Sequence, residues 1–179
     1  MRNSGAAFED PAALRELFRL PLPGHAAFRA LNGYDRDVPV APDTRESAVL
    51  ILLHPGAGGL HTLLMKRPEY DGVHSAQIGF PGGKREPQDR HTEDTALREF
   101  TEETGAPHEG FEVLGHLSPV HIPPSRTVVT PVVAYAERLG TLQPDPREVA
   151  ALIPAPLQDL LRNDILKRTR VYVRSNALS

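Results

Sequence analysis

The sequence predicts a single domain of the α/β or α+β class, in which helices pack on a mixed β-sheet. Three observations predict this class. Two short apolar segments, 47–54 and 60–68, flank a glycine-rich turn and indicate a hairpin. Residues 91–104 carry apolar side chains at helical spacing, with Gly105 placed to end the helix. Two further strands are predicted at 111–120 and 127–137, on either side of a proline-rich turn.

The flanking segments complete this order of elements. Asp10 and Pro11 start an apolar periodic stretch and predict an N-terminal helix over 10–20, followed by a loop rich in Pro, Gly and Asp. Pro131 inside a predicted strand indicates a bulge or an edge position, because proline has no N–H to donate. Helical turns are predicted at 145–153 and 154–163, and a last strand at 167–174. We therefore expect an N-terminal extension over 1–46 and the main domain over 47–179.

Composition limits the class of function. The chain has 179 residues, and its contents of 40% hydrophobic and 24% charged residues suit one globular domain. A net charge of -3 argues against nonspecific binding to nucleic acid. The lack of cysteine excludes disulfides, thiolate catalysis and cysteine-ligated zinc. The N-terminus has no apolar signal segment, and the aliphatic run 48–53 is too short to span a bilayer. We expect a cytoplasmic protein without membrane partners, and the sequence does not determine its oligomeric state.

Three glutamates gather near the end of the predicted helix 91–104. Glu99, Glu102 and Glu103 lie on one arc of the helix, beside an apolar stripe that includes Ala96 and Phe100. Like charges at this spacing repel, and the helix dipole disfavours anions near a C-terminus. No lysine stands four residues after any of the three. The arrangement therefore needs either full solvation or a compensating cation.

The two interpretations of this acidic arc differ in function. A solvated surface is the more frequent reason for glutamates on an arbitrary helix. A divalent cation such as Mg²⁺ would instead remove the repulsion, because hard cations take carboxylate oxygens and keep waters that a phosphate can replace. The preceding loop, Phe80-Pro81-Gly82-Gly83, favours the cation, since glycine lets a backbone carbonyl come close enough to be a further ligand.

These residues resemble the Nudix hydrolase family. Its box is written Gly, five residues, Glu, seven residues, Arg-Glu-U-x-Glu-Glu-x-Gly-U, where U is apolar. The matching residues here are Gly83, Arg98, Glu99, Phe100, Glu102, Glu103, Gly105 and Ala106. The second half of the box is complete. In the first half, Asp89 replaces the first Glu and one extra residue precedes Arg98, which leaves the role of Asp89 open.

The segment before the box resembles the coenzyme A diphosphatase subfamily. That signature runs Leu-Leu, Arg, then His-x-Gly-(Glu/Gln)-x-x-Phe-Pro-Gly-Gly. The matches are Leu63, Leu64, Arg67, His74, Gln77, Phe80, Pro81, Gly82 and Gly83, with Ala76 in place of the first Gly. The resemblance covers about residues 47–155, and family members usually continue beyond the end of this chain.

The resemblance implies a fold and a reaction. The fold would be the Nudix α/β/α sandwich, with a mixed central sheet and the box as a loop-helix-loop. The reaction would be metal-dependent hydrolysis of coenzyme A or acyl-CoA to 4′-phosphopantetheine and 3′,5′-ADP. Two alternatives stay open: a Nudix hydrolase acting on ADP-ribose, NADH or a dinucleotide polyphosphate, and a non-catalytic module that senses a nucleotide.

The resemblance also implies roles for single residues. Mg²⁺ or Mn²⁺ would be held by Glu99, Glu102, Glu103 and the Gly82 carbonyl, and Arg98 would orient one of the glutamates. The general base stays open between Glu102, Glu103 and Glu148, although Glu148 also suits the first turn of a helix. The expected substrate-binding residues are Arg67, His74, Gln77, Phe80 and Lys84.

Two of these substrate roles have alternatives. Cations near the box would bind the 3′-phosphate of coenzyme A, or would be ordinary solvated surface residues; they are Lys66, Arg67, Lys84 and Arg85. His74 would either donate a hydrogen bond to a phosphate or brace the loop in which it lies.

Overall fold

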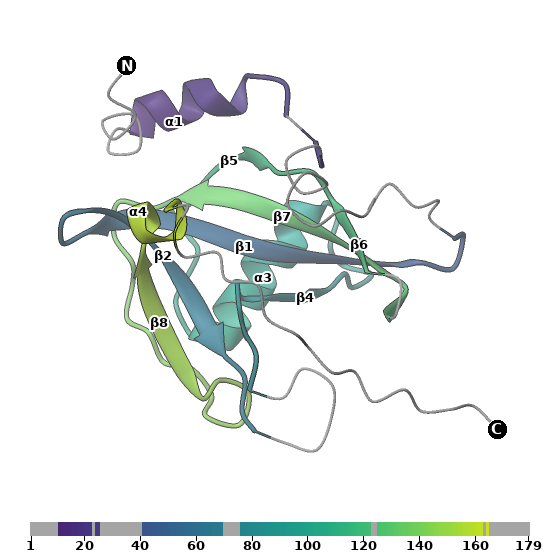
Figure 1. Cartoon of the computed structure of the whole chain (residues 1–179). Coiled ribbons are helices and arrows are strands. Elements are labelled where there is room, and N and C mark those ends of the chain that lie inside the picture. Colours follow the sequence, from purple (N-terminus) through teal and green to yellow (C-terminus); the bar gives the residue numbers. More distant parts are fainter. Residues whose placement is uncertain are drawn as a thin grey trace.

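The computed structural model describes residues 11–22, 24–25, 41–69, 76–122, 125–162 and 164. They form an eight-stranded mixed sheet with helices on both faces (Figure 1). The elements are α1 (Pro11–Phe18), β1 (Arg45–Gly56), β2 (Gly59–Lys66), β3 (Ile78–Gly79), β4 (Gly82–Lys84), α3 (Thr92–Thr104), β5 (Glu112–His116), β6 (Val120–Ile122), β7 (Thr127–Tyr135), β8 (Ala151–Pro156) and α4 (Leu157–Leu160). The predicted strand 167–174 lies outside the described residues. None of the described helices is long and apolar enough to cross a membrane.

Strand β1 organises the sheet. It runs parallel to β7 along one edge and antiparallel to two different strands along the other. On that second edge, β2 pairs with residues 53–56 and β4 pairs with residues 47–49. The predicted hairpin of β1 and β2 is confirmed, but β2 leaves β1 after the turn and pairs onward with β3 and β8. The first half of β1 is thereby left for β4, which carries Gly82 and Gly83.

The two faces of the sheet bury separate apolar clusters. One cluster joins Leu50 and Leu52 of β1 to Ala96 and Phe100 of α3, all fully buried. The other joins Leu53 to Leu14 of α1, with Leu157 of α4 packed against it. Side chains alternate between the faces along a strand, so β1 supplies both clusters. The molecule is therefore an α/β/α sandwich, as predicted.

Both ends of α3 are set by local contacts. Before the helix, the Asp94 carboxylate accepts the backbone N–H groups of Arg90 and His91 at 2.8 and 2.9 Å. At the other end Gly105 is left-handed, with φ 71°, and donates its N–H to the Thr101 carbonyl. A Cβ at Gly105 would overlap the Gln143 carbonyl, so glycine is needed there for space as well. The predicted helix and its C-terminal glycine are confirmed.

The predicted strand 111–120 is divided into β5 and β6. The prediction that Pro131 lies on an edge strand is wrong. β7 pairs on both sides, with β1 on one and with β5 and β6 on the other. Pro131 lies opposite the break between β5 and β6, where its carbonyl accepts the Leu117 N–H at 2.9 Å. Its missing N–H is tolerated because the ladder is already interrupted at that point.

The predicted helical turn at 145–153 is half wrong. The Asp145 carbonyl accepts the N–H groups of Glu148 and Val149, which closes a turn. Residues 151–156 then form β8 and pair with β2 from Lys66↔Ala151 to His61↔Pro156. The strand forms because the edge of β2 that faces away from β1 needs a hydrogen-bonding partner, which local propensity cannot reveal. The short helix α4 falls within the predicted turn 154–163.

Phe100 is the largest fully buried side chain and joins α3 to the sheet. We expect Phe100→Ala to lower the free energy of unfolding by about 3–5 kcal/mol, because it removes buried apolar surface and leaves a cavity. Urea unfolding would measure the loss. Leu161→Ala, at a position that is 53% exposed, is the control and should change the stability by less than about 0.5 kcal/mol. Equal effects of both substitutions would contradict this placement of the core.

Candidate metal and active site

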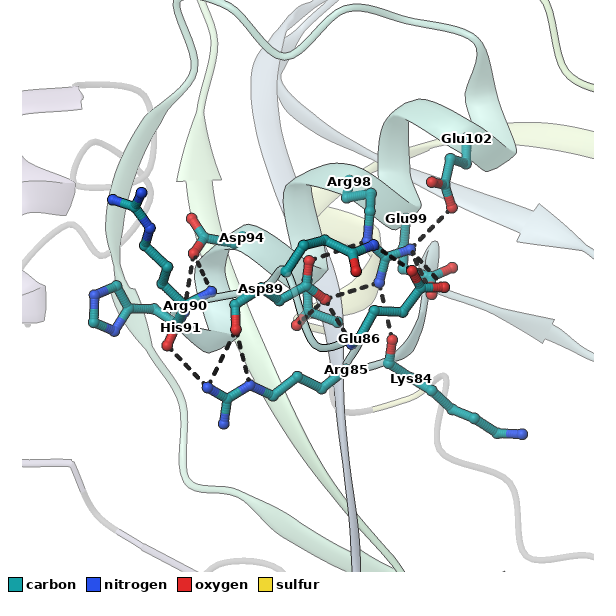
Figure 2. A network of polar contacts seen from close by, with 12 residues as sticks. Lys84, Arg85, Glu86, Asp89, Arg90, His91, Asp94, Arg98, Glu99 and Glu102 are labelled. Atoms are coloured by element: carbon teal, nitrogen blue, oxygen red, sulfur yellow. Dashed lines mark hydrogen bonds and ion pairs between the residues drawn. The ribbon is translucent and has the colours of Figure 1, made fainter.

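The guanidinium of Arg98 is the centre of the polar network on α3 (Figure 2). Its Nε and Nη2 donate to the two carboxylate oxygens of Asp89 at 3.1 and 2.9 Å. Nη2 also donates to the Lys84 carbonyl at 2.9 Å. Nη1 donates to Glu99 at 3.2 Å and to Glu102 at 3.0 Å. Arg98 therefore ties the loop 84–89 to two of the three glutamates.

The structure shows the role of Asp89, which the sequence left open. Its side chain is 3% exposed, and it accepts hydrogen bonds from the Glu86 N–H and the Thr95 hydroxyl, both at 2.9 Å. The hydrogen bonds from Arg98, opposed by burial and assisted by the other two donors, hold the pKa of Asp89 far below its usual range. Asp89 is thus a buried anion that fixes Arg98.

Glu103 occupies a different environment from its neighbours on the helix. It is 5% exposed, accepts the Gly82 N–H at 2.7 Å, and lies 3.3 Å from the Arg67 guanidinium. Burial raises the pKa of Glu103 to about 7; the Gly82 N–H and Arg67 oppose the rise, and the charges of Glu99 and Glu148 add to it. Burial likewise raises the pKa of Glu99. Burial thus makes both carboxylates harder to ionise than a glutamate in water.

The two glycines of the loop make room for the glutamates. The Glu99 carboxylate lies over Gly83, where a Cβ would overlap it. Gly82 has φ 157°, and a Cβ there would overlap the Ala48 carbonyl in β1. The pairing of β4 with β1 therefore requires glycine at both positions, and it aims the Gly82 N–H at Glu103.

The predicted need for a cation is met in part by the chain itself. Arg98 compensates Glu99 and Glu102, and Arg67 compensates Glu103. Among the residues that the structure describes, no three His, Asp or Glu side chains are grouped closely enough to hold a metal ion. The donors are nevertheless all oxygens, and the raised pKa values mark carboxylates whose charge is undercompensated. The donor chemistry fits a hard divalent cation, once Glu102, which is 55% exposed, turns from Arg98.

The expected substrate-binding residues are placed unevenly. The Arg67 guanidinium contacts Glu103. The backbone N–H of Arg67 donates to the Gln77 carbonyl at 2.9 Å. Phe80 is partly buried between β3 and β4. The Lys84 side chain is exposed and extends away from the network, to which only its carbonyl contributes (Figure 2). His74 lies outside the described residues.

The structure brings Glu148 toward the acidic arc, although more than forty residues separate them in sequence. β8 pairs with β2 and the Ala150 N–H donates to the Lys66 carbonyl at 2.9 Å, so the turn before β8 lies next to the end of β2 that carries Arg67. The charge of Glu148 contributes to the raised pKa of Glu103. The glutamate is exposed to solvent.

Sequence reasoning missed several contributors to this site. Thr95 and the Lys84 carbonyl support Asp89 and Arg98, and neither was singled out. Arg85 was predicted either to bind a phosphate or to be a solvated surface residue; it pairs with Glu46 and donates to the Asp89 and Arg90 carbonyls. The only available signal was the spacing of Thr95, six residues after Asp89 and one turn before Arg98.

Comparison with known proteins agrees with this geometry. The NUDIX domain family matches residues 44–174. The chain belongs to the Nudix family. Its Nudix relatives include the uncharacterized Nudix hydrolase NudL of Yersinia enterocolitica, 40% identical over 100 residues, which are 56% of this chain and 51% of that protein. NudL of Pectobacterium atrosepticum is 40% identical over 118 residues, 64% of this chain and 59% of that protein. The matched regions thus span about half the length of these Nudix relatives.

Solved Nudix structures share the fold. The Nudix hydrolase RenU from M. smegmatis superposes with a TM-score of 0.55 at 26% identity, covering 65% of this chain and 73% of that one. The Ap4A hydrolase of C. elegans in a binary complex gives a TM-score of 0.54 at 18% identity, covering 65% of this chain and 83% of that one. The predicted mixed sheet with a Nudix loop-helix-loop is confirmed.

Asp89→Asn tests the buried pair that supports this Nudix helix. We expect it to lower the stability at pH 7 by about 3 kcal/mol, because Arg98 stays buried without its anion. The folded pKa of Asp89 is depressed, so its contribution is present above the unfolded pKa of about 3.9 and is lost as the pH falls below it. Thermal melts of both proteins from pH 7 to pH 2 should therefore show a constant difference in melting temperature down to about pH 4, and a difference that shrinks below pH 4 without reaching zero. A constant difference between the two melting temperatures across that range would show that the Asp89 charge is irrelevant.

Proposed function

We propose that this protein hydrolyses the diphosphate bond of coenzyme A or acyl-CoA, releasing 4′-phosphopantetheine and 3′,5′-ADP, with Mg²⁺ or Mn²⁺. The observation that carries the proposal is the joining of two motifs at one place. Three residues of the coenzyme A signature, Arg67, Gly82 and Gly83, lie directly against glutamates of the box. The Arg67 contact to Glu103 links the signature to the box through side chains.

The metal ligands in this proposal are Glu99, Glu102, Glu103 and the Gly82 carbonyl. A bound divalent cation would neutralise the diphosphate and lower the pKa of the attacking water. The residues of the chain position these ligands: Gly82 holds Glu103 through its N–H, and Arg98 holds Glu99 and Glu102. Arg98 is a positioning residue in this proposal, because its guanidinium ties these glutamates to Asp89 and to the Lys84 carbonyl.

Glu148 is our candidate for the general base, ahead of Glu102 and Glu103. It is exposed, and its charge contributes to the raised pKa of Glu103, which supports a place beside the acidic arc. Glu103 by contrast is occupied by the Gly82 N–H and Arg67. Substrate contacts are assigned to Arg67, His74, Gln77, Phe80 and Lys84.

The proposal can be tested by mass analysis of the products. Purified protein with Mg²⁺ is incubated separately with coenzyme A, ADP-ribose, NADH and a dinucleotide polyphosphate. We expect 4′-phosphopantetheine and 3′,5′-ADP to form fastest. Faster cleavage of ADP-ribose or NADH would contradict the choice of coenzyme A and would indicate a Nudix hydrolase with a different substrate. Binding of a nucleotide without any cleavage would favour a sensing module.

Glu103→Gln tests whether Glu103 is a metal ligand or only supports the fold. The substituted amide keeps an oxygen to accept the Gly82 N–H, so we expect the melting temperature to stay near that of the wild type. Turnover with Mg²⁺ should fall by about 100-fold or more, because a neutral amide is a poor ligand for a hard cation. Steady-state kinetics on coenzyme A would measure the fall. Glu109→Gln, at an exposed position away from the box, is the matched control, and unchanged turnover in Glu103→Gln would remove the metal assignment.

A further inference from the structure

A cavity of about 520 Å³ adjoins the box on the side of the loop 84–89. It lies between the first residues of β1, the end of β4 and the loop that leads to α3. The charged residues that line it are Arg45, Glu46, Lys84, Arg85, Glu86 and Asp89. Its volume is in the range of small-ligand sites. Equal numbers of cations and anions line it, so its preference depends on which charges are already paired.

The three carboxylates of the cavity are all engaged. Asp89 is held by both arms of Arg98. Glu46 pairs with Arg85. Glu86 accepts a hydrogen bond from Gln88 and lies 3.9 Å from Arg98. These carboxylates therefore present little free negative charge to a ligand.

The three cations differ from one another. Arg85 is committed to Glu46 and to the carbonyls of Asp89 and Arg90. Within the parts of the chain that the structure describes, neither the Arg45 guanidinium nor the Lys84 ammonium has a hydrogen-bonded or ion-paired partner. Both side chains are exposed. The cavity thus has two uncompensated positive charges, which favour a ligand group carrying a double negative charge.

The cavity is one residue away from the acidic arc. Lys84 directly follows Gly83, and the Glu99 carboxylate lies over Gly83. Neighbouring Cα atoms are about 3.8 Å apart, so the cavity begins beside the glycine that the Glu99 carboxylate covers, within reach of the sugar phosphate of a nucleotide whose diphosphate lies at the glutamates. In the register of β1 with β4, Ser47 lies opposite Lys84. Arg45 is two residues before Ser47 on β1, so it lies near Lys84 on the adjacent strand.

We propose that this cavity binds a 3′-phosphate on the ribose of the substrate, with Arg45 and Lys84 as the residues that contact it. The assignment rests on the proposed function, in that it makes the cavity the reason for choosing coenzyme A over nucleotides without a 3′-phosphate. Arg45 is a new specificity residue, supplied by the start of β1, outside both the box and the coenzyme A signature. Substituting Lys84 removes only its ammonium, because its carbonyl still accepts from Arg98.

Binding of the nucleotide product tests the site without any reaction. Isothermal titration would compare 3′,5′-ADP with 5′-AMP on the wild type and on the Arg45→Ala, Lys84→Ala double variant. We expect the wild type to bind 3′,5′-ADP at least tenfold more tightly and the double variant to lose this preference, since each lost charged contact is worth about one decade of affinity. Arg138 lines a different cavity, beside Phe111 and Glu137, so Arg138→Ala removes a charge there and should keep the preference. Equal binding of both nucleotides by the wild type would overturn the proposal.

Hydrolysis distinguishes this proposal from the proposed function. Coenzyme A and dephospho-CoA differ only in the 3′-phosphate. The double variant should raise KM for coenzyme A about tenfold or more, with kcat and the KM for dephospho-CoA unchanged, and Lys84→Arg should retain most of the wild-type KM. Equal losses on both substrates would overturn the site. A wild type that hydrolyses neither substrate, yet still prefers 3′,5′-ADP over 5′-AMP, would overturn the diphosphatase assignment and leave the 3′-phosphate site standing.

Discussion

The buried ion pair of Arg98 and Asp89 supports the rest of the site. Removing both charges from water is costly, and such a pair persists only where nearly every donor and acceptor is used. Here Asp89 receives bonds from Arg98, Thr95 and the Glu86 N–H, while Arg98 also binds the Lys84 carbonyl and two glutamates. These contacts therefore tie the loop 84–89 to the helix α3. The glycine loop before them is positioned by the same contacts.

The three glutamates of the site are held in two different ways. Glu103 is buried against the Gly82 N–H and Arg67, whereas Glu102 is mostly exposed and shares Arg98 with Glu99. An internal arginine thus partly neutralises the helix end in the absence of a bound cation. This arrangement keeps the like charges of α3 from destabilising the helix and leaves oxygens that a harder cation can take over.

The division of one edge of β1 is what assembles these groups. Because β2 departs from β1 after the hairpin, β4 can pair with the first half of β1, while β8 pairs with the edge of β2 that faces away from β1. The first pairing brings Gly82 and Gly83 against α3, and the second brings Glu148 toward Glu103. The cavity beside Arg45 and Lys84 also owes its walls to the pairing of β1 with β4.

The sequence by itself determined the local features: the hairpin, the helix 92–104 with its terminal glycine, and the order of the box residues. Each depends on periodicity, caps and glycines, which act within a few residues. It did not determine the role of Asp89, the strand β8, the interior place of Pro131 or the pairing of Arg85 with Glu46. Those depend on which strand edges remain unpaired and on which charges meet across the sheet. Such contacts join residues far apart in the chain, so only the tertiary structure decided them.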